Sequence, residues 1–326
     1  MSKSFRRYLA TVAVLSVTAC GGGGGGGGET GTTPTVPTPV TDTTVTSVPA
    51  ATYAVGSSEA ATFALLNAER GRCGLGLLAQ NTKLDVAAAA HAKYLTTNNV
   101  IGHDEVSTKP DFYESTASAR GFKSGYGTGA SEDVSGKVQH SHPGVTMLPQ
   151  TDEAGAMYAV RQLLSGPYHG KDLTIGYRDV GMASFGIAFV AMPALASGQE
   201  MQHNNGDVRT YPCEGTTGTL STSEGEIPSP FPSESNAKWG QPILVYGSAD
   251  LAVSTATVTG PSGTVAIKAI FGKDVDPNGY FKAGSTGVAV IPAATMTPNT
   301  AYTVTIAGTN KGSAFTKSFS FTTGAY

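Results

Sequence analysis

The stretch LLNAERGRCGLGLLAQNTKLDVAAAAHAKYLTTNNVIGH, residues 65–103, decides the fold of the first half of the chain. A candidate helix N-cap precedes it at Ser57 or Ser58, and the helical spacing runs to Gly71, which predicts a first helix that stops at this glycine. A second helix is predicted over residues 82–99, where residues spaced at i, i+3, i+4, i+7 and i+11 would share one face. That face consists of Leu84, Ala87, Ala88, His91 and Leu95.

Farther along the chain, two segments extend this pattern into a mixed domain. Residues 152–164 have a helical spacing, and VGMASFGIAFVAM, residues 180–192, is an apolar run typical of a buried strand. We therefore predict a domain of mixed α and β structure over residues 57–215.

The apolar residues of the remaining chain have a different spacing. After about residue 226, the apolar runs are PILVY, ATVT, TVAIKAI, GVAVIP, AYTVTI and FTKSFSFTT. They are rich in β-branched and aromatic residues and are separated by turn residues about every ten positions, which is typical of a β-sandwich. The sequence thus predicts an all-β domain over residues 240–326, a linker with the Pro-rich segment IPSPFP over residues 216–239, and an α+β fold class overall.

The N-terminus has the features of an export signal. Basic residues precede a short apolar run that is well below the roughly 20 residues needed to cross a membrane, so residues 1–19 are predicted to be a cleaved signal peptide. The end of this run, VTAC, resembles a bacterial lipobox, which implies lipidation of Cys20; the alternative is an ordinary secretory signal. The Gly run and Thr/Pro-rich tract over residues 20–56 read as a tether. Because Gly21 replaces the aspartate that usually signals retention at the inner membrane, we expect an outer-membrane lipoprotein of the bacterial cell envelope.

Charge and motifs exclude several functions. The net charge is −3, and removal of the basic signal peptide makes the chain more negative. Nucleic acid is therefore not an expected partner, because its binding needs clustered Lys and Arg. The sequence also contains no GxSxG elbow, HExxH motif or phosphate-binding Gly loop.

Two cysteines remain besides Cys20. In an exported chain, Cys73 and Cys213 are expected to form a disulfide, with two free buried thiols as the alternative. The bond would close a loop of about 140 residues and contribute roughly 4 to 5 kcal/mol in the chain-entropy model.

Three segments in order resemble the CAP superfamily, also called SCP-like, which includes cysteine-rich secretory proteins, antigen 5 and plant pathogenesis-related proteins. They are residues 65–103, GASEDV at 129–134 and LLSGPYHGKDL at 163–173. The resemblance implies an α-β-α sandwich for residues 57–215. The segments IPAATMTPNTAYTVTIAG and KSFSFTT resemble bacterial Ig-like modules, which implies an Ig-like sandwich for residues 240–326.

The CAP resemblance also implies a central cleft in which His103, His169 and Glu132 lie together, and such residues bind a divalent metal in some members. The family's second glutamate has no counterpart, because its candidate positions are occupied by Leu163 and Gly166. Two histidines and one glutamate with an open water position form a reasonable ligand set for zinc. The alternative is that these groups hydrogen-bond one another and the loops, with no tightly bound metal.

Other histidines have a more ordinary interpretation. His91 lies on the apolar face of the second helix, and we expect it to be a hydrogen-bonded core residue. His140 and His142 form a His-x-His pair that could chelate a transition metal, but their polar, Gly-rich surroundings favour solvated loop residues.

These observations favour a surface-anchored lipoprotein whose cleft binds a small ligand, a lipid or a divalent metal without turnover. A first alternative is a metal-assisted hydrolase that uses His103, His169 and Glu132, with Glu132 or Asp133 as the base. A second is an extracellular adhesion or matrix protein that acts through the Ig-like domain. The membrane, through the N-terminal lipid, is an expected partner in each case.

Overall fold

The computed structural model describes residues 42–137, 152–203, 206–282 and 287–325. The chain from Pro39 to Tyr326 forms one compact unit of mixed helices and strands. The helices in the described residues are α1 (Ser58–Arg72), α2 (Thr82–Asn98), α3 (Ala117–Lys123), α4 (Asp152–Leu164) and α5 (Pro167–Thr174). The α+β class is therefore confirmed, and helices occur where residues 65–103 and 152–164 predict them.

Local side chains fix the ends of the first two helices. The Oγ atom of Ser57 accepts a hydrogen bond from the backbone N–H of Ala60, so Ser57 is the N-cap of α1. This helix continues one residue beyond Gly71, its predicted stop. Helix α2 begins after Asn81, whose side chain accepts from the N–H of Lys83, and ends at Asn99, which adopts a left-handed conformation with φ of 51°.

The first sheet has the strand order β1 (Ala79–Gln80), β3 (Asp179–Phe185), β4 (Ala188–Ala194) and β2 (Asp133–Gly136). The strand predicted over residues 180–192 is a hairpin of two strands, β3 and β4. The turn between them contains Gly186, whose φ of 50° lies in the left-handed region that favours glycine. The two strands read as one apolar run in the sequence because both faces of each strand are buried.

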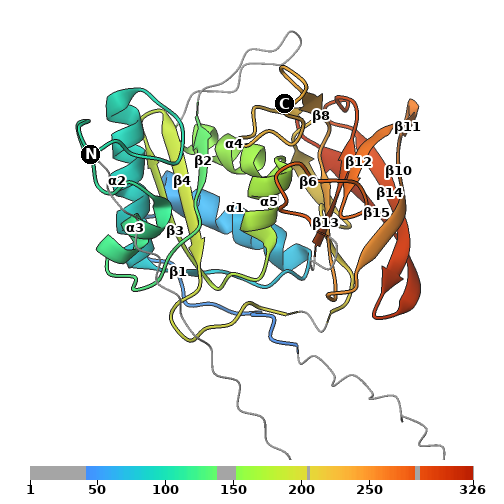
Figure 1. The fold of residues 1–326 in the computed structure, drawn as a ribbon, viewed down its shortest axis with the longest axis horizontal. Coiled ribbons are helices and arrows are strands. Elements are labelled where there is room, and N and C mark those ends of the chain that lie inside the picture. The colour runs from blue at the N-terminus through green and yellow to red at the C-terminus, as the bar shows by residue number, and fades with distance from the viewer. Residues whose placement is uncertain (1–41, 138–151, 204–205, 283–286, 326) are drawn as a thin grey trace, which may run out of the picture. The chain divides into compact units, whose positions relative to one another are not determined.

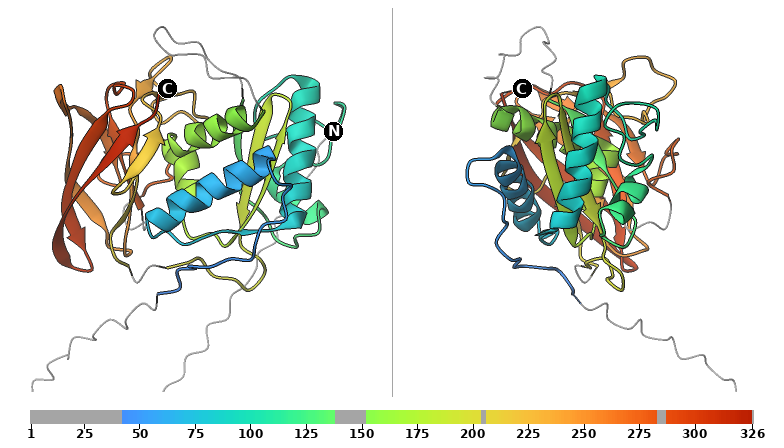
Figure 2. Two further views of the ribbon diagram at one scale, coloured as in Figure 1. Left: turned by 180° about the vertical axis from the view of Figure 1, so that it is seen from behind. Right: turned by 90° about the vertical axis from the view of Figure 1, so that its left-hand side faces the viewer.

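Helices cover both faces of this sheet (Figures 1 and 2). Val180 and Met182 of β3 pack in one hydrophobic cluster with side chains of α1 and α4. On the other face, Ala183 and Val190 pack in a second cluster with α2. The predicted face of α2 is fully buried there, which explains its apolar spacing.

Two further sheets of five and four strands follow in the second half of the chain. One has the order β11 (Gly263–Val265), β10 (Ala252–Gly260), β14 (Ala301–Asn310), β15 (Ser313–Thr323) and β6 (Thr216–Thr219). The other has the order β12 (Ile267–Phe271), β13 (Gly287–Pro292), β9 (Ile243–Tyr246) and β5 (Arg209–Tyr211). Their facing side chains, including Val245 and Val304, form a third hydrophobic cluster, so the two sheets pack face to face.

The sheet that contains β9 and β13 is buried on both faces. Ile243 and Val245 of β9 point toward the other β-sheet, whereas Leu244 and Tyr246 pack with residues of α4 and α5. The layers therefore follow one another from α2 through the first sheet, the α1, α4 and α5 layer, and the two β-sheets (Figure 1). Strands β5 and β6, which precede residue 220 in sequence, complete these two sheets.

Two segments predicted to be connectors are integrated into this unit. Residues 216–239, predicted as a linker, contain β6, β7 (Ser223–Glu224) and β8 (Lys238–Trp239). Residues 42–56, predicted as part of the tether, contact the folded body: the N–H of Thr43 donates to the carbonyl of His203 at 2.8 Å. Amino-acid composition predicts both the linker and the tether, but composition does not reveal backbone hydrogen bonds of this kind.

The predicted disulfide is present between Cys73 and Cys213 and joins the end of α1 to the segment after β5. Within the described ranges, no helix is long and apolar enough to cross a membrane. The signal peptide, Cys20 and the pair His140 and His142 lie outside the described residues.

Candidate functional site

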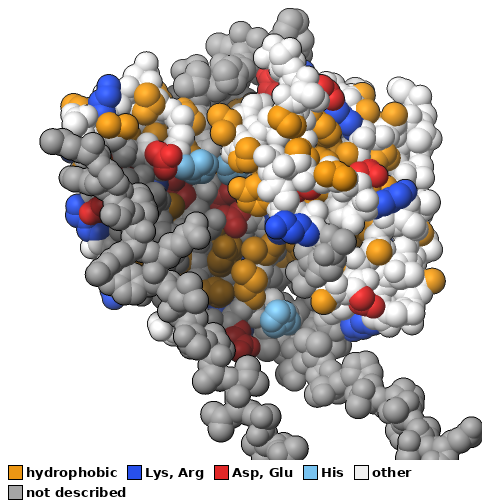
Figure 3. Space-filling view, viewed as in Figure 1, with side chains coloured by type: hydrophobic (Ala, Val, Ile, Leu, Met, Phe, Trp, Pro, Cys, Tyr) orange, Lys and Arg blue, Asp and Glu red, His pale blue; other side chains and the backbone are white. Residues whose placement is uncertain are grey.

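Two histidines from distant segments lie side by side. His103 is in the loop that follows α2, and His169 is in the first turn of α5. Their ring centroids are 5.8 Å apart with 20° between the ring planes. They face a cavity of about 400 Å³, named here the imidazole cavity, whose walls include His103, Glu132, Asp133, His169, Asp172 and Tyr280. Histidine and acidic side chains lie side by side at a hollow in this face of the molecule (Figure 3).

Glu132 orients His103 from just before β2. The Nδ1 atom of His103 lies 3.2 Å from Oε2 of Glu132. The buried guanidinium of Arg120 donates to both oxygens of Glu132 at 2.7 Å and to the carbonyl of His103 at 2.7 Å. Burial alone would raise the pKa of Glu132, but the hydrogen bond from His103 and the charges of His91 and Arg120 outweigh it, so the pKa is lowered.

His91 lies behind this pair in the environment predicted for a core histidine. It is fully buried, with Nδ1 at 2.8 Å from Glu105 and Nε2 at 2.9 Å from the carbonyl of Gly102. Both ring nitrogens thus face acceptors. Because Gly102 immediately precedes His103, this contact ties the His103 loop to α2.

A glutamate that the sequence analysis missed orients the second histidine. Oε1 of Glu226 lies 3.1 Å from Nδ1 of His169, and it accepts from the backbone N–H groups of Tyr168 and His169 at 2.8 and 2.9 Å. Glu226 follows β7 and reaches α5 because Gly166 has no side chain. A Cβ atom at Gly166 would lie only 2.6 Å from Oε1 of Glu226.

Glu226 therefore occupies the space beside Gly166, one of the two positions at which the CAP resemblance implies a glutamate. The one indirect signal in the sequence is the glycine at this position. Nothing in the segment around residue 226 itself indicates a contact with His169, because the two residues are 57 positions apart.

Two aspartates complete the polar wall. Asp133 is completely buried, and neither of its carboxyl oxygens has a hydrogen-bond partner among the described residues. Burial raises its pKa well above the usual value, and the charges of Asp172, Glu132 and Glu226 raise it further. Burial also raises the pKa of Asp172, although Ser131 donates a hydrogen bond to its carboxylate. The surroundings of Asp133 therefore disfavour its ionised form, and only the ionised form could act as a base.

Of the predicted zinc ligands His103, His169 and Glu132, only the glutamate is already engaged in this arrangement. Arg120 donates to both oxygens of Glu132, whereas each histidine holds Nδ1 to a glutamate and leaves Nε2 open. In the part of the chain that the structure describes, no three His, Cys, Asp or Glu side chains are grouped to hold a metal ion. The two Nε2 atoms remain for a ligand, since neither has a protein partner among the described residues.

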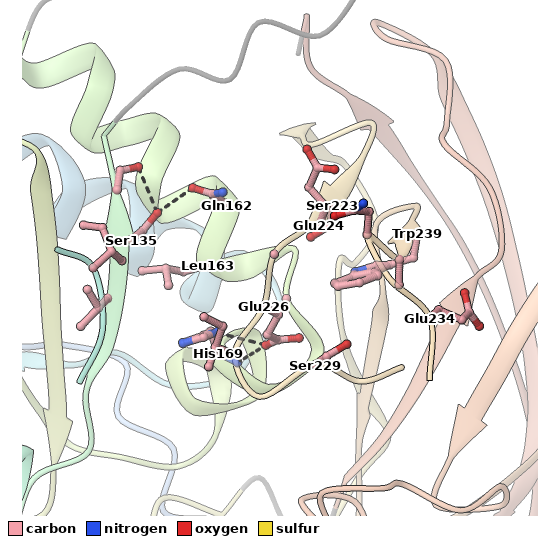
Figure 4. A pocket seen from close by; sticks show the side chains of 18 residues that line it. Ser135, Gln162, Leu163, His169, Ser223, Glu224, Glu226, Ser229, Glu234 and Trp239 are labelled. Atoms are coloured by element: carbon pink, nitrogen blue, oxygen red, sulfur yellow. Dashed lines mark hydrogen bonds and ion pairs between the residues drawn. The ribbon is translucent and has the colours of Figure 1, made fainter. Parts of the chain in front are cut away.

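A larger hollow adjoins the imidazole cavity and shares His169 and Ile227 with it. Its volume is about 790 Å³, and β2, α4 and the segment after β7 form its walls (Figure 4). We name it the edge hollow; its lining includes Val134, Ser135, Gly136, Gln162, Glu226 and Trp239. Ile227, at the boundary of the two spaces, is 70% exposed.

Sequence comparisons do not identify a relative. No family model matches the chain, and no curated protein is significantly similar to it in sequence.

Proposed function

We propose that the protein is a CAP-type lipoprotein of the bacterial cell envelope whose cleft binds a small polar ligand without turnover. The observation that carries this proposal is the imidazole pair above the cavity. Each Nδ1 is held by a glutamate, so each ring is fixed in orientation and directs Nε2 away from that glutamate. Fixed polar groups at the wall of a concave space are the general features of a small-molecule site.

The CAP assignment is supported by the order of the motifs and by the layers they form. His103, at the end of the segment 65–103, lines the imidazole cavity together with residues of the GASEDV and GPYHG segments. The helices on both faces of the first sheet agree with the sandwich that the resemblance implies.

Binding is favoured over hydrolysis by the state of the acidic groups. Glu132 is an ionised partner of Arg120, and burial disfavours the ionised form of Asp133, so neither is poised as the base that the hydrolase alternative requires. The C-terminal part of the chain also contributes to the binding site, because Tyr280, which lies between β12 and β13, lines the imidazole cavity. This contact favours a role of the C-terminal part in the cleft over a separate role in adhesion.

A ligand screen by thermal shift tests the proposal. The full chain in detergent would be screened against amino acids, short peptides, sugars, polyamines and fatty acids. A ligand present at 100 times its Kd should raise Tm by about 5 to 10 °C. The double variant His103→Ala, His169→Ala should lose this shift, whereas His203→Ala, which removes an exposed imidazole outside both spaces, should keep it. Equal shifts in all three proteins, or conversion of the ligand detected by mass spectrometry, would contradict the proposal.

Anchoring is tested separately by Cys20→Ser. Lipid attachment needs the sulfur, so the variant should leave the membrane fraction after cell lysis, as followed by immunoblot. A variant that still sediments with washed membranes would contradict the lipoprotein assignment.

A further inference from the structure

Strand β2 is an edge of the first sheet and has one side without a neighbouring strand. The sheet order ends at β2, and its register with β4 pairs Asp133 with Ala191 and Ser135 with Phe189. Just before β2, the N–H of Ser131 donates to the carbonyl of Pro193 in β4, on the side of β2 that faces β4. Because hydrogen-bonding groups alternate along an antiparallel strand, the intervening residues direct their N–H and C=O groups away from β4.

These outward residues are Glu132, Val134 and Gly136. Among the described residues, none of their backbone N–H groups has a hydrogen-bond partner. Such a row of backbone donors and acceptors is a template for an added strand.

The edge hollow lies against this free side. Val134, Ser135 and Gly136 line it, and Glu226 lies across from them (Figure 4). Glu226 is buried, and its Oε2 atom has no hydrogen-bond partner among the described residues. The hollow thus presents an unpaired strand edge on one wall and an unsatisfied carboxylate oxygen on the other.

We propose that the edge hollow binds an extended, positively charged polypeptide segment that adds to β2 as a further strand. This inference rests on the proposed function and names the class of ligand. Addition of a strand to an exposed edge is a recurring mode of peptide recognition, in which main-chain hydrogen bonds give affinity and side-chain pockets give specificity.

The dimensions of the hollow suit such a segment. The four residues of β2 span about 13 Å at 3.3 Å per residue, which matches about four residues of ligand. The segment would run past His169, which lies at the junction of the two spaces, and so would place a peptide group at the imidazole pair.

The charge of the hollow specifies a basic segment. Three glutamates line it, and no Lys or Arg is among the described residues that do so. Glu224 and Glu234 are paired with Lys238 and Lys268. Glu226 has no such lysine or arginine partner, so we expect its Oε2 atom to receive a Lys or Arg side chain of the ligand.

Fluorescence anisotropy with synthetic peptides tests this inference on the full chain in detergent. The probe is labelled TKVKTKVK, with TEVETEVE as the charge control. Two further versions of the Lys peptide carry N-methyl groups on alternate backbone amides, one version at the odd positions and the other at the even positions. Since only one side of the ligand strand pairs with β2, one methylated version should bind about tenfold or more weakly than the other.

Protein variants test the charged contact. Glu226→Gln should weaken binding of the Lys peptide by about tenfold or more, because a charge-assisted hydrogen bond is lost. Glu200→Gln, which changes an exposed glutamate outside the hollow, should leave the affinity unchanged. The methylated peptides need no protein variant, so the test does not depend on the stability of Glu226→Gln.

The outcomes separate this inference from the proposed function. Equal binding of both methylated peptides, or of the Glu peptide, would overturn strand addition of a basic segment. Binding of a neutral oligosaccharide such as maltohexaose without binding of any peptide would overturn it in favour of a glycan. If no peptide binds while other small ligands raise Tm in a way that depends on His103 and His169, only the inference of strand addition fails. If neither peptides nor other small ligands bind, the inference and the proposed function both fail.

Discussion

At the scale of single residues, the site depends on a buried set of charges behind the imidazole pair. Arg120 lies between Glu105 and Glu132 and is completely buried. Arg120→Met should lower the free energy of unfolding by about 3 to 5 kcal/mol, because two buried carboxylates would lose their cation. Urea denaturation measures this effect. Lys93→Met is the matched control, since its ion pair with Asp111 is exposed to solvent and should contribute little; equal loss in both variants would contradict the assigned role of the buried charges.

Replacement of Asp133 is expected to raise the free energy of unfolding, whereas replacement of Arg120 is expected to lower it. Its raised pKa means that the folded state resists ionisation, so folded Asp133 keeps its proton to a higher pH than the unfolded chain does. Stability therefore falls as pH rises from about the unfolded value of 3.8 toward the higher folded value. Asp133→Asn should be more stable than the wild type by about 0.5 to 2 kcal/mol at pH 7 and lose this advantage at pH 3, as measured by urea denaturation at both pH values. An advantage that is the same at both pH values would contradict a raised pKa of Asp133.

At the scale of elements, α5 depends on the absence of a side chain just before it. Glu226 accepts from the first N–H groups of this helix only because Gly166 leaves room. Gly166→Ala should displace the carboxylate, cost about 1 to 3 kcal/mol and release His169 from its fixed orientation. Urea denaturation and NMR titration of the His169 ring report the two effects.

Gly155→Ala in α4 is the matched control for this substitution. Its added Cβ would lie 3.5 Å from the nearest atom, an ordinary contact, and alanine favours the helix, so the variant should be as stable as the wild type or more so. If Gly166→Ala behaves in the same way, Glu226 does not hold the start of α5.

The same elements show how far the sequence could predict the structure. Helix α4 was predictable because its 3.6-residue period is local, and its bounds agree with those expected at residues 152–164. The hairpin of β3 and β4 was not, because burial on both faces removes the alternation that marks two separate strands. Glu226 escaped prediction for a different reason: its role depends on the packing of β7 beside α5, which no local pattern records.

At the scale of the whole molecule, the arrangement of layers decides how the protein unfolds. The sheet with β9 and β13 has two apolar faces, one against α4 and α5 and one against the other β-sheet. Its strand β5 precedes residue 215, the predicted end of the first domain, and the disulfide between Cys73 and Cys213 ties that strand's end to α1. Neither predicted domain can therefore lose its structure without exposing apolar surface of the other.

We accordingly expect one cooperative unfolding transition in differential scanning calorimetry, with equal calorimetric and van't Hoff enthalpies. Fragments 57–215 and 240–326, expressed separately, should each lack a cooperative transition, because each exposes one side of this shared core. The double variant Cys73→Ala, Cys213→Ala serves as a control: it should lower Tm by weakening the whole unit, by roughly 4 to 5 kcal/mol in the chain-entropy model, while the transition remains single. Two resolved transitions in the intact protein, or a fragment that unfolds cooperatively alone, would instead show that the C-terminal sheets fold independently of the cleft they help to form.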